Sequence, residues 1–246
     1  LAEQLAEQLQ ALDLTNNALR EAQRRLLSER EEERKHLARE LHDQIIQDLL
    51  SINYELEEIA TRQTVSPELD ADLATVRKSI RDLIGNLRHI CGNLRPPTID
   101  SLGLGAAIQS FVYDWHKRTG IEYTLDMDSD LGRLPETIEL SIFRILQESL
   151  NNIWRHAHAS MATIELRHTS PRTLMIAISD NGLGLPENLD LTALTSDGHY
   201  GLIGISERVS LLGGRMHLEK SEPGGTVLMV EIPHPRVEVK RKTKNS

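Results

Sequence analysis

The chain of 246 residues is 39% hydrophobic, 26% charged and only 3% aromatic, with a net charge of −9. This length suggests one or two domains, and the modest hydrophobic share suits long solvated helices attached to a smaller packed domain. The negative charge argues against direct binding to nucleic acid, which usually requires a basic footprint, and no run of about 18 apolar residues predicts a membrane-spanning helix.

Residues 1–30 repeat in sevens. This spacing predicts a coiled-coil signalling helix, and an asparagine in the repeat favours a parallel dimer. A lone amphipathic helix is the alternative, and four successive leucines at spacing seven make it the weaker interpretation. One heptad position holds Leu5, Leu12, Leu19 and Leu26, and the other holds Ala2, Leu9, Asn16 and Gln23.

Residues 31–97 carry two apolar stripes that predict a helical hairpin. The first stripe begins at Leu37, eleven residues after Leu26, which is a heptad plus four and therefore a stutter. Ser66 is the expected N-cap of the second helix, and Pro96-Pro97 ends it. Two such hairpins, paired by the coiled coil, would form a dimeric four-helix bundle. The stripes are Leu37, Leu41, Ile45, Leu49, Ile52, Leu56 and Ile59, then Leu69, Leu73, Val76, Ile80, Leu83, Leu87, Ile90 and Leu94.

From residue 98 to residue 234 the elements become shorter and glycines appear. Mixed helices and strands predict a layered α/β domain, so the fold class is α plus α/β. Residues 235–246 form a basic tail, which we interpret as a solvated terminus rather than a binding patch. Helices are expected at 105–118, 134–157 and 201–212, and strands at 121–127, 162–168, 173–179, 216–220 and 226–232.

Residues 39–47 place an imidazole, a carboxylate and an amide within about a turn and a half of one helix. The imidazole of His42 can attack phosphorus if one ring nitrogen is free, and the carboxylate of Asp43 can orient the ring and take its proton. Gln47 cannot act as a base, but it can position a water. This neighbourhood alone favours an ordinary helical histidine beside an acid.

The α/β region contains further polar motifs, each of which is weak alone. Glu148 and Asn152 are four residues apart on a helix, so two oxygen donors of the kind that Mg²⁺ prefers share a face. Arg155 and His156 add donor groups near the end of that helix. A plain polar helix face is the alternative interpretation.

Two glycine-rich motifs follow. Asp180 ends a strand before Gly182 and Gly184, where backbone can approach a ligand closely, although many turns share this pattern. Residues 198–208 open a helix with glycines, and helix N-termini bind phosphate. Between them, residues 187–197 are either a lid over a nucleotide or a surface loop.

In order and spacing these motifs resemble sensor histidine kinases of the nitrate-sensor class, whose partners are response regulators with helix-turn-helix output domains. Residues 33–47 resemble the phosphoacceptor box, 147–157 the N box, 180–184 the G1 box and 198–208 the G2 box. The resemblance covers roughly residues 30–234. It implies a homodimeric histidine-phosphotransfer bundle followed by an ATP-binding domain of the gyrase and heat-shock-chaperone type.

The resemblance also implies residue roles in an ATP-dependent protein-histidine kinase. His42 would take the γ-phosphate of ATP, Asp43 would be the general base, and Gln47 would position the water that dephosphorylates the regulator. Mg²⁺ would be bound by Asn152 with help from Glu148, and Asp180 would read adenine. The residues implied to contact ATP are Glu148, Asn152, Arg155, His156, Asp180, Gly182, Gly184, His199, Tyr200, Gly201, Leu202, Gly204 and Thr226.

Three residues of the N box depart from the family pattern. Arg155 stands where lysine is frequent, Asn151 stands where a small hydroxyl residue is common, and Trp154 is bulkier than expected. None removes a chemically essential group, so we expect an active enzyme. The alternatives are a catalytically silent nucleotide-binding scaffold and an ATPase without histidine transfer.

The chain begins within a helical pattern, so we expect a fragment of a longer protein. We place this segment in the cytoplasm without membrane contact, since no signal peptide is visible. The single Cys91 excludes an internal disulfide and is expected to be buried. The stimulus, the cognate regulator, cis or trans phosphorylation and a membrane anchor elsewhere in the protein are left open.

Overall fold

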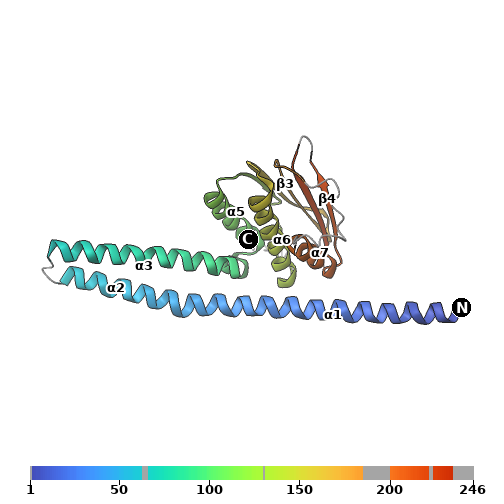
Figure 1. Cartoon of the computed structure of the whole chain (residues 1–246), viewed down its shortest axis with the longest axis horizontal. Coiled ribbons are helices and arrows are strands. Elements are labelled where there is room, and N and C mark those ends of the chain that lie inside the picture. The colour runs from blue at the N-terminus through green and yellow to red at the C-terminus, as the bar shows by residue number, and fades with distance from the viewer. Residues whose placement is uncertain (1, 63–65, 130, 185–199, 222–223, 235–246) are drawn as a thin grey trace, which may run out of the picture. The chain divides into compact units, whose positions relative to one another are not determined.

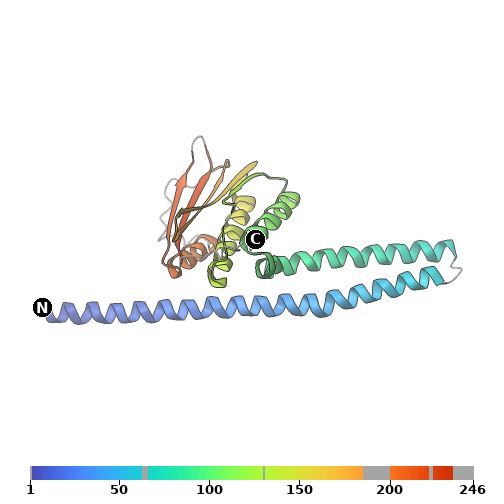
Figure 2. The ribbon, with the colours of Figure 1, turned by 180° about the vertical axis from the view of Figure 1, so that it is seen from behind.

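A computed structural model describes residues 2–62, 66–129, 131–184, 200–221 and 224–234. The chain divides into two compact units, residues 1–97, here called the helical unit, and residues 98–246, here called the sheet unit (Figures 1 and 2). Within the described ranges, no helix combines the length and the apolar character needed to cross a bilayer.

The helical unit is one long helix that folds back on itself. Helix α1 (Ala2–Glu40) passes into the π-helix η1 (Leu41–Ile46) and continues as α2 (Gln47–Arg62). Helix α3 (Pro67–Leu94) returns alongside (Figure 1). The predicted N-cap is confirmed, because Ser66 Oγ accepts a hydrogen bond from the backbone N–H of Leu69 at 3.3 Å.

The apolar stripes of the hairpin divide between two faces. The buried cluster is small, and Cys91 belongs to it as predicted. At η1 the inward position is taken by Ile46, which is only 1% exposed, while its neighbour Ile45 of the predicted stripe is 44% exposed. The buried residues are Ile46, Ile80, Ile84 and Cys91, with Leu41, Leu49, Leu56 and Leu87 packed against them.

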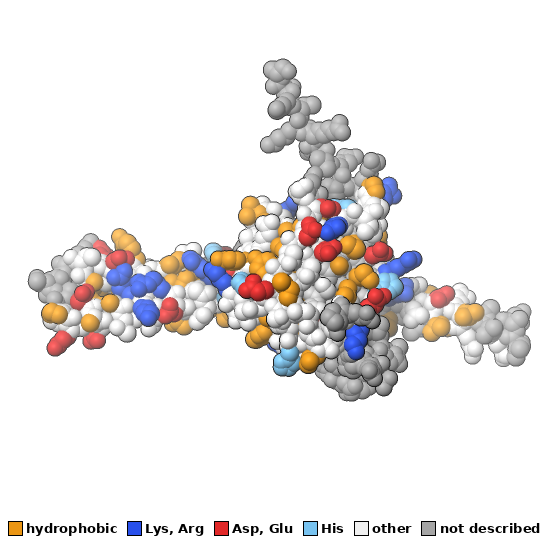
Figure 3. All heavy atoms as spheres, turned by 90° about the horizontal axis from the view of Figure 1, so that it is seen from above, with side chains coloured by type: hydrophobic (Ala, Val, Ile, Leu, Met, Phe, Trp, Pro, Cys, Tyr) orange, Lys and Arg blue, Asp and Glu red, His pale blue; other side chains and the backbone are white. Residues whose placement is uncertain are grey.

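Eight other apolar side chains of the hairpin face outward in a second series, here called the outward stripe. Its members are between 41% and 52% exposed, and along α3 they recur every seven residues. Figure 3 shows apolar side chains among charged ones on the hairpin surface. The outward stripe comprises Leu37, Ile45, Ile52 and Ile59 before the turn, and Leu69, Val76, Leu83 and Ile90 after it.

The sheet unit has a five-stranded sheet in the order β1-β2-β3-β5-β4. Strand β1 is parallel to β2, and the other neighbours are antiparallel. The predicted α/β layers are confirmed, although α4 was not predicted. The elements are α4 (Pro97–Leu102), α5 (Leu104–Thr119), β1 (Glu122–Met127), α6 (Glu136–Asn152), the π-helix η2 (Ile153–Ala157), β2 (Met161–Ser170), β3 (Thr173–Asp180), α7 (Tyr200–Leu211), β4 (Arg215–Lys220) and β5 (Thr226–Pro233).

Helices α5, α6 and α7 lie together on one face of the sheet, and the core fills the space between these layers (Figures 1 and 2). Alternate residues of β2 and β3 are buried, as the two-residue period of a strand requires. Fully buried side chains from both layers include Val112, Phe143, Ile145, Leu146 and Leu150 of the helices and Ile164, Leu166, Leu174 and Ile176 of the strands.

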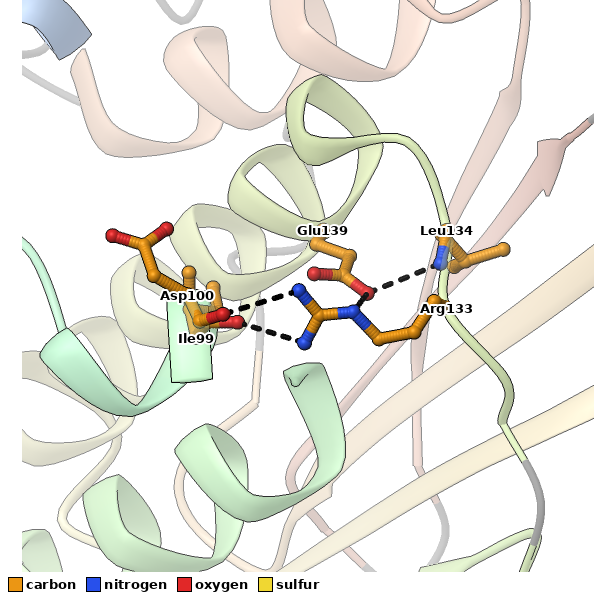
Figure 4. Close-up of polar contacts among 5 residues, drawn as sticks. All are labelled: Ile99, Asp100, Arg133, Leu134 and Glu139. Atoms are coloured by element: carbon orange, nitrogen blue, oxygen red, sulfur yellow. Dashed lines mark hydrogen bonds and ion pairs between the residues drawn. The ribbon is translucent and has the colours of Figure 1, made fainter. Parts of the chain in front are cut away.

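An arginine fixes α4 to the segment that opens α6 (Figure 4). Arg133 donates hydrogen bonds from Nη1 to the carbonyl of Ile99 at 3.1 Å and from Nη2 to that of Asp100 at 3.4 Å. Its Nε lies 3.7 Å from Oε1 of Glu139, which also accepts from the backbone N–H of Leu134 at 3.1 Å. Burial raises the pKa of Glu139, and the Leu134 N–H and the Arg133 charge oppose that rise.

Candidate functional site

His42 lies in η1 with its ring open to solvent. Its Nδ1 is 3.0 Å from Oδ1 of Asp43, and the two side chains are 55% and 71% exposed. When Nδ1 carries the ring proton and donates it to Asp43, the lone pair of the imidazole lies on Nε2. The predicted neighbours therefore form an oriented nucleophile that a phosphoryl donor can reach.

A π-turn lies between Asp43 and Gln47, which are four positions apart. η1 runs into α2 without a break, so His42, Asp43 and Gln47 belong to one continuous helical segment, as predicted. Gln47 is exposed at the first position of α2, on the far side of this turn. Such turns often occur at functional sites.

Glu148 and Asn152 lie near the end of α6 and converge on the first turn of α7. A Cβ placed on Gly201 would collide with Oε1 of Glu148 and would lie 3.1 Å from Oδ1 of Asn152. Both oxygens therefore contact the same backbone position, which confirms that they share a helix face. A larger residue at position 201 would therefore have to push the flexible carboxylate of Glu148 aside.

The amide group of Asn152 fits a bound Mg²⁺–nucleotide. Within the described ranges its Nδ2 is buried without a hydrogen-bond partner, and leaving such an atom unpaired is costly. Turning the amide by 180° would place its oxygen there instead. Although the described residues contain no cluster of three or more His, Cys, Asp or Glu that could hold a metal, Mg²⁺ usually takes only one or two protein ligands beside phosphate oxygens and waters.

Asp180 ends β3 and is 8% exposed. Its Oδ1 accepts a hydrogen bond from the backbone N–H of Gly182 at 2.8 Å, and Thr226 donates from its backbone and its side chain. Burial raises the pKa of Asp180, and these hydrogen bonds oppose the rise. Thr226, another of the residues implied to contact ATP, therefore lies beside Asp180. A buried carboxylate at this position can accept a hydrogen bond from an amino group of a ligand.

The glycines after Asp180 allow three backbone segments to meet. A Cβ on Gly182 would collide with the carbonyl oxygen of Ala157, and Leu183 N–H donates to that oxygen at 2.8 Å. Gly184 has a φ of +75°, and a Cβ there would lie 2.8 Å from the carbonyl oxygen of Gly225. The loop after β3 is therefore packed against η2 and against the turn before β5.

The other predicted contact residues have more varied positions. Arg155 and His156 are exposed on η2, while Leu202 is partly buried against the core. A Cβ on Gly204 would meet nothing within 4 Å, so no described neighbour requires glycine there. His199, the side chain of Tyr200 and the predicted lid at 187–197 lie outside the described residues.

A chain of contacts links the described residues of the sheet unit that were predicted to bind ATP. Asn152 leads into η2, η2 packs on the loop of Gly182, and Asp180 reaches Thr226 beside that loop. Sequence reasoning missed both π-helices. One signal for η1 was present, because the outward stripe advances by eight residues from Leu37 to Ile45 and by seven thereafter.

Two family models match the chain. A histidine kinase model, HisKA_3, matches residues 33–99, and a model described as histidine kinase-, DNA gyrase B-, and HSP90-like ATPase matches residues 137–236. The first covers the His42 hairpin and the second covers the site built by Glu148, Asn152, Asp180 and Thr226.

Curated relatives and a solved structure agree with these matches. The chain is 32% identical over 216 residues to the sensor histidine kinase MctS of Rhizobium johnstonii (87% of the chain, 46% of MctS). It is 28% identical over 214 residues to the oxygen sensor histidine kinase NreB of Staphylococcus carnosus (87% and 60%), and 28% identical over 211 residues to the histidine-protein kinase/phosphatase DegS of Brevibacillus brevis (85% and 53%). The chain thus spans about half the length of these relatives.

The fold is also that of a solved histidine kinase domain, from the blue-light activated kinase EL346 of Erythrobacter litoralis. The TM-score is 0.50 and the identity is 18%, over 76% of this chain and 94% of that one.

Proposed function

The chain belongs to the histidine kinases, and from that premise we propose that it is the catalytic core of a two-component sensor kinase, which phosphorylates His42 from ATP and passes the phosphoryl group to a response regulator. The observation that carries this proposal is the exposed His42 ring, held through Nδ1 by Asp43 at 3.0 Å, on a chain that also carries an ATPase-type domain.

The proposed chemistry is in-line attack of His42 Nε2 on the γ-phosphorus. The N–P bond forms as the bond from phosphorus to the ADP oxygen breaks, and Asp43 takes the Nδ1 proton. Phosphoryl transfer depends on positioning and charge neutralisation more than on covalent help from the protein. Asp43 therefore contributes by fixing the ring and accepting the proton.

The sheet unit supplies the proposed nucleotide site. Asp180 would accept the adenine amino group, and Asn152 with Glu148 would hold Mg²⁺, which neutralises phosphate charge when bound. Arg155 and His156 would contribute donors from η2. The backbone of Gly182, Gly184, Gly201 and Gly204, with Leu202 and Thr226, would line the nucleotide, and so would His199 and Tyr200.

We further propose that two copies pair through the outward stripe. The family implies dimerisation, and eight apolar side chains of the hairpin, each between 41% and 52% exposed, would lose solvent contact against a second hairpin. The domain assignment that follows is a signalling coiled coil at 1–30, a phosphotransfer hairpin at 31–97, an ATP-binding domain at 98–234 and a basic tail at 235–246. Because ATP is the proposed phosphoryl donor, the proposal also locates this segment in the cytoplasm.

Labelling with ATP tests the kinase proposal against its alternatives. The chain is incubated with Mg²⁺ and γ-labelled ATP beside a His42→Gln variant. We expect acid-labile, alkali-stable label on the unmodified chain and none on the variant. Label that persists in the variant would refute the role of His42. Nucleotide binding without labelling would indicate a silent scaffold, and hydrolysis without labelled protein would indicate an ATPase.

The proposed partner is a response regulator with a helix-turn-helix output domain, because the phosphoacceptor box resembles that of kinases with such partners. Gln47 would position the water that removes phosphate from the regulator. We expect Gln47→Ala to preserve autophosphorylation and to slow regulator dephosphorylation. Equal loss of both activities would contradict this role.

A further inference from the structure

Trp154 lies in the middle of the proposed nucleotide-binding segment, between Asn152 and Arg155. Its side chain is 46% exposed, and it contacts another side chain. The guanidinium of Arg118 lies over the ring, 5.4 Å from its centroid. Arg118 belongs to the last turn of α5, so this cation–π contact joins α5 to the segment that follows α6.

Trp154 lies in η2, a π-helical turn whose hydrogen-bond register depends on contacts with other parts of the sheet unit. η2 covers Ile153–Ala157 and follows α6 without a break, and π-helical hydrogen bonding is rare outside such single turns. An α-helix turns by about 100° per residue, so a change of one residue in register would rotate the side chains beyond it by about that angle. The register of η2 therefore decides which way Arg155 and His156 point.

The C-terminal end of η2 is fixed by the loop after β3. Ala157 O accepts the Leu183 N–H at 2.8 Å, and Gly182 packs against the same carbonyl. His158 then ends the helix with a φ of +51°, the one positive φ of a non-glycine residue within the described ranges. The Arg118–Trp154 contact is a second attachment, near the N-terminal end of the same segment.

We propose that Arg118 and Trp154 are positioning residues for the nucleotide. Their stacking holds η2 in its π register, so that Arg155 and His156 face the phosphates while neither Arg118 nor Trp154 touches the nucleotide. This inference rests on the proposed function, because it concerns the same ATP site. It also gives a role to Trp154, the bulky residue that departs from the N-box pattern.

Calorimetric titration of the full chain with Mg²⁺ and a non-hydrolysable ATP analogue tests the pair. We expect Arg118→Ala and Trp154→Ala each to raise the Kd by about two- to fivefold, the range that a partly exposed cation–π contact supports. The double variant should bind no more weakly than the weaker single variant. Trp154→Phe, which keeps an aromatic face, should recover most of the affinity.

The neighbouring residue provides a control for charge. Lys117 lies beside Arg118 on α5, and its ammonium lies over the Tyr113 ring of the same helix at 4.3 Å. Lys117→Ala removes an equal charge and a similar contact without touching η2, so the Kd should not change. In autophosphorylation assays the pair variants should raise KM for ATP and leave kcat and the unfolding temperature unchanged, whereas a general folding defect would alter all three.

The outcomes separate this inference from the proposal beneath it. An unchanged Kd in the pair variants, an equal loss in Lys117→Ala, or additive losses in the double variant would each overturn the positioning role while the kinase proposal stands. An unmodified chain that does not bind the ATP analogue would overturn the proposed function, and the positioning role with it.

Discussion

The helical unit and the sheet unit bury their apolar side chains in different ways. In the helical unit the buried cluster is limited to Ile46, Ile80, Ile84 and Cys91, while the outward stripe stays half exposed. In the sheet unit one continuous cluster contains side chains with no exposed surface, such as Phe143 and Ile164. The sheet unit buries its apolar side chains within one chain. The helical unit leaves an apolar face exposed, which a second copy would cover.

The two units also treat their π-helices differently. η1 carries His42 and Asp43 on an open surface, where a donor and an acceptor can both approach. η2 follows Asn152 and is held by Leu183 and by Arg118. Exposure suits His42, which would react first with a phosphoryl donor and then with an acceptor. Restraint suits η2, whose side chains would have to stay in place to bind a nucleotide. The comparison therefore sets the proposed transfer site apart from the proposed nucleotide site within one chain.

The largest expected effect is on association through the outward stripe. Leu83 on α3 is 52% exposed, so Leu83→Asp should leave the hairpin core intact while placing a charge in the proposed dimer interface. Burial of a leucine contributes about 1.5–3 kcal/mol, and a two-fold interface loses it twice, so the dimer Kd should rise by about 10²–10⁴. Sedimentation velocity measures this change.

The control for Leu83→Asp is Arg81→Asp, which introduces the same side chain, with a larger change in charge, at an exposed polar position of α3. Sedimentation of that variant should match the unmodified chain. If Leu83→Asp also remains dimeric, the outward stripe is not the interface. The helical unit would then not need a second copy to cover its apolar face, and the contrast with the sheet unit would be wrong.

The second effect is on the free energy of unfolding of the sheet unit. Phe143 is fully buried and packs edge-on against Phe111 with ring centroids 5.3 Å apart. Phe143→Ala should lower the free energy of unfolding by about 3–5 kcal/mol through lost burial and a cavity. Both tryptophans, Trp115 and Trp154, lie in this unit, so urea unfolding followed by tryptophan fluorescence reports on it alone.

Repeating the urea unfolding at several protein concentrations tests whether the sheet unit is stable without a second copy. The unfolding midpoint of the sheet unit should be independent of concentration, in the unmodified chain and in Leu83→Asp alike. A midpoint that rises with concentration would show that the sheet unit also depends on a second copy.

Much of the difference between the two units could be predicted from sequence, because the spacing of apolar residues indicates which segments form helices and which form strands. The sequence predicted a strand at 173–179, and the structure forms β3 there with Leu174, Ile176 and Ile178 buried at alternate positions. The His42–Asp43 contact follows from adjacency on one helix. These features depend on residues that are close in the sequence.

The features that were missed depend on residues far apart. At η2 the apolar pattern does not distinguish an α-turn from a π-turn. The residues that contact this segment, Leu183 and Arg118, are connected to it by no local motif. Arg133 likewise reads as an ordinary loop residue, although it binds two carbonyls of α4 more than thirty positions earlier. A close approach such as Gly201 against Glu148 also requires the tertiary packing of α7 on α6.

The third effect is on nucleotide binding at the meeting of α6 and α7. Gly201→Ala would place a Cβ against Oε1 of Glu148 and close to Asn152. The carboxylate should move, and Mg²⁺-dependent affinity for an ATP analogue should fall by about tenfold, the value of a lost charge-assisted contact of about 1.4 kcal/mol. Helix stability should not fall, because alanine is the better helix former.

Gly204→Ala on the same helix sharpens that result. Its Cβ would meet nothing within 4 Å, so any loss of affinity there would come from the nucleotide itself and would support the predicted approach of ligand to Gly204. If Gly201→Ala binds the analogue normally, Glu148 does not contribute to the site in the proposed way.

The smallest effect is the pH dependence of two carboxylates in the sheet unit whose pKa values move in opposite directions. Burial raises the pKa of Glu139 above its ordinary 4.5, so the folded state holds the proton more tightly than the unfolded state. Its stability contribution is therefore complete below about pH 4.5 and is lost as pH rises through the folded pKa. The backbone N–H of His168, 2.7 Å from Oδ2, lowers the pKa of Asp128 below 3.8.

Two matched variants turn this difference into a measurement. Between about pH 7 and pH 4.5, the unmodified chain should gain stability relative to Glu139→Gln, because only the unmodified chain can neutralise its buried charge. Relative to Asp128→Asn it should lose stability as pH falls further, through the lowered pKa of Asp128. Urea midpoints at several pH values test both slopes. Parallel slopes for the two variants would mean that Arg133 keeps Glu139 charged, and the contact that fixes α4 would then be a full ion pair throughout this range.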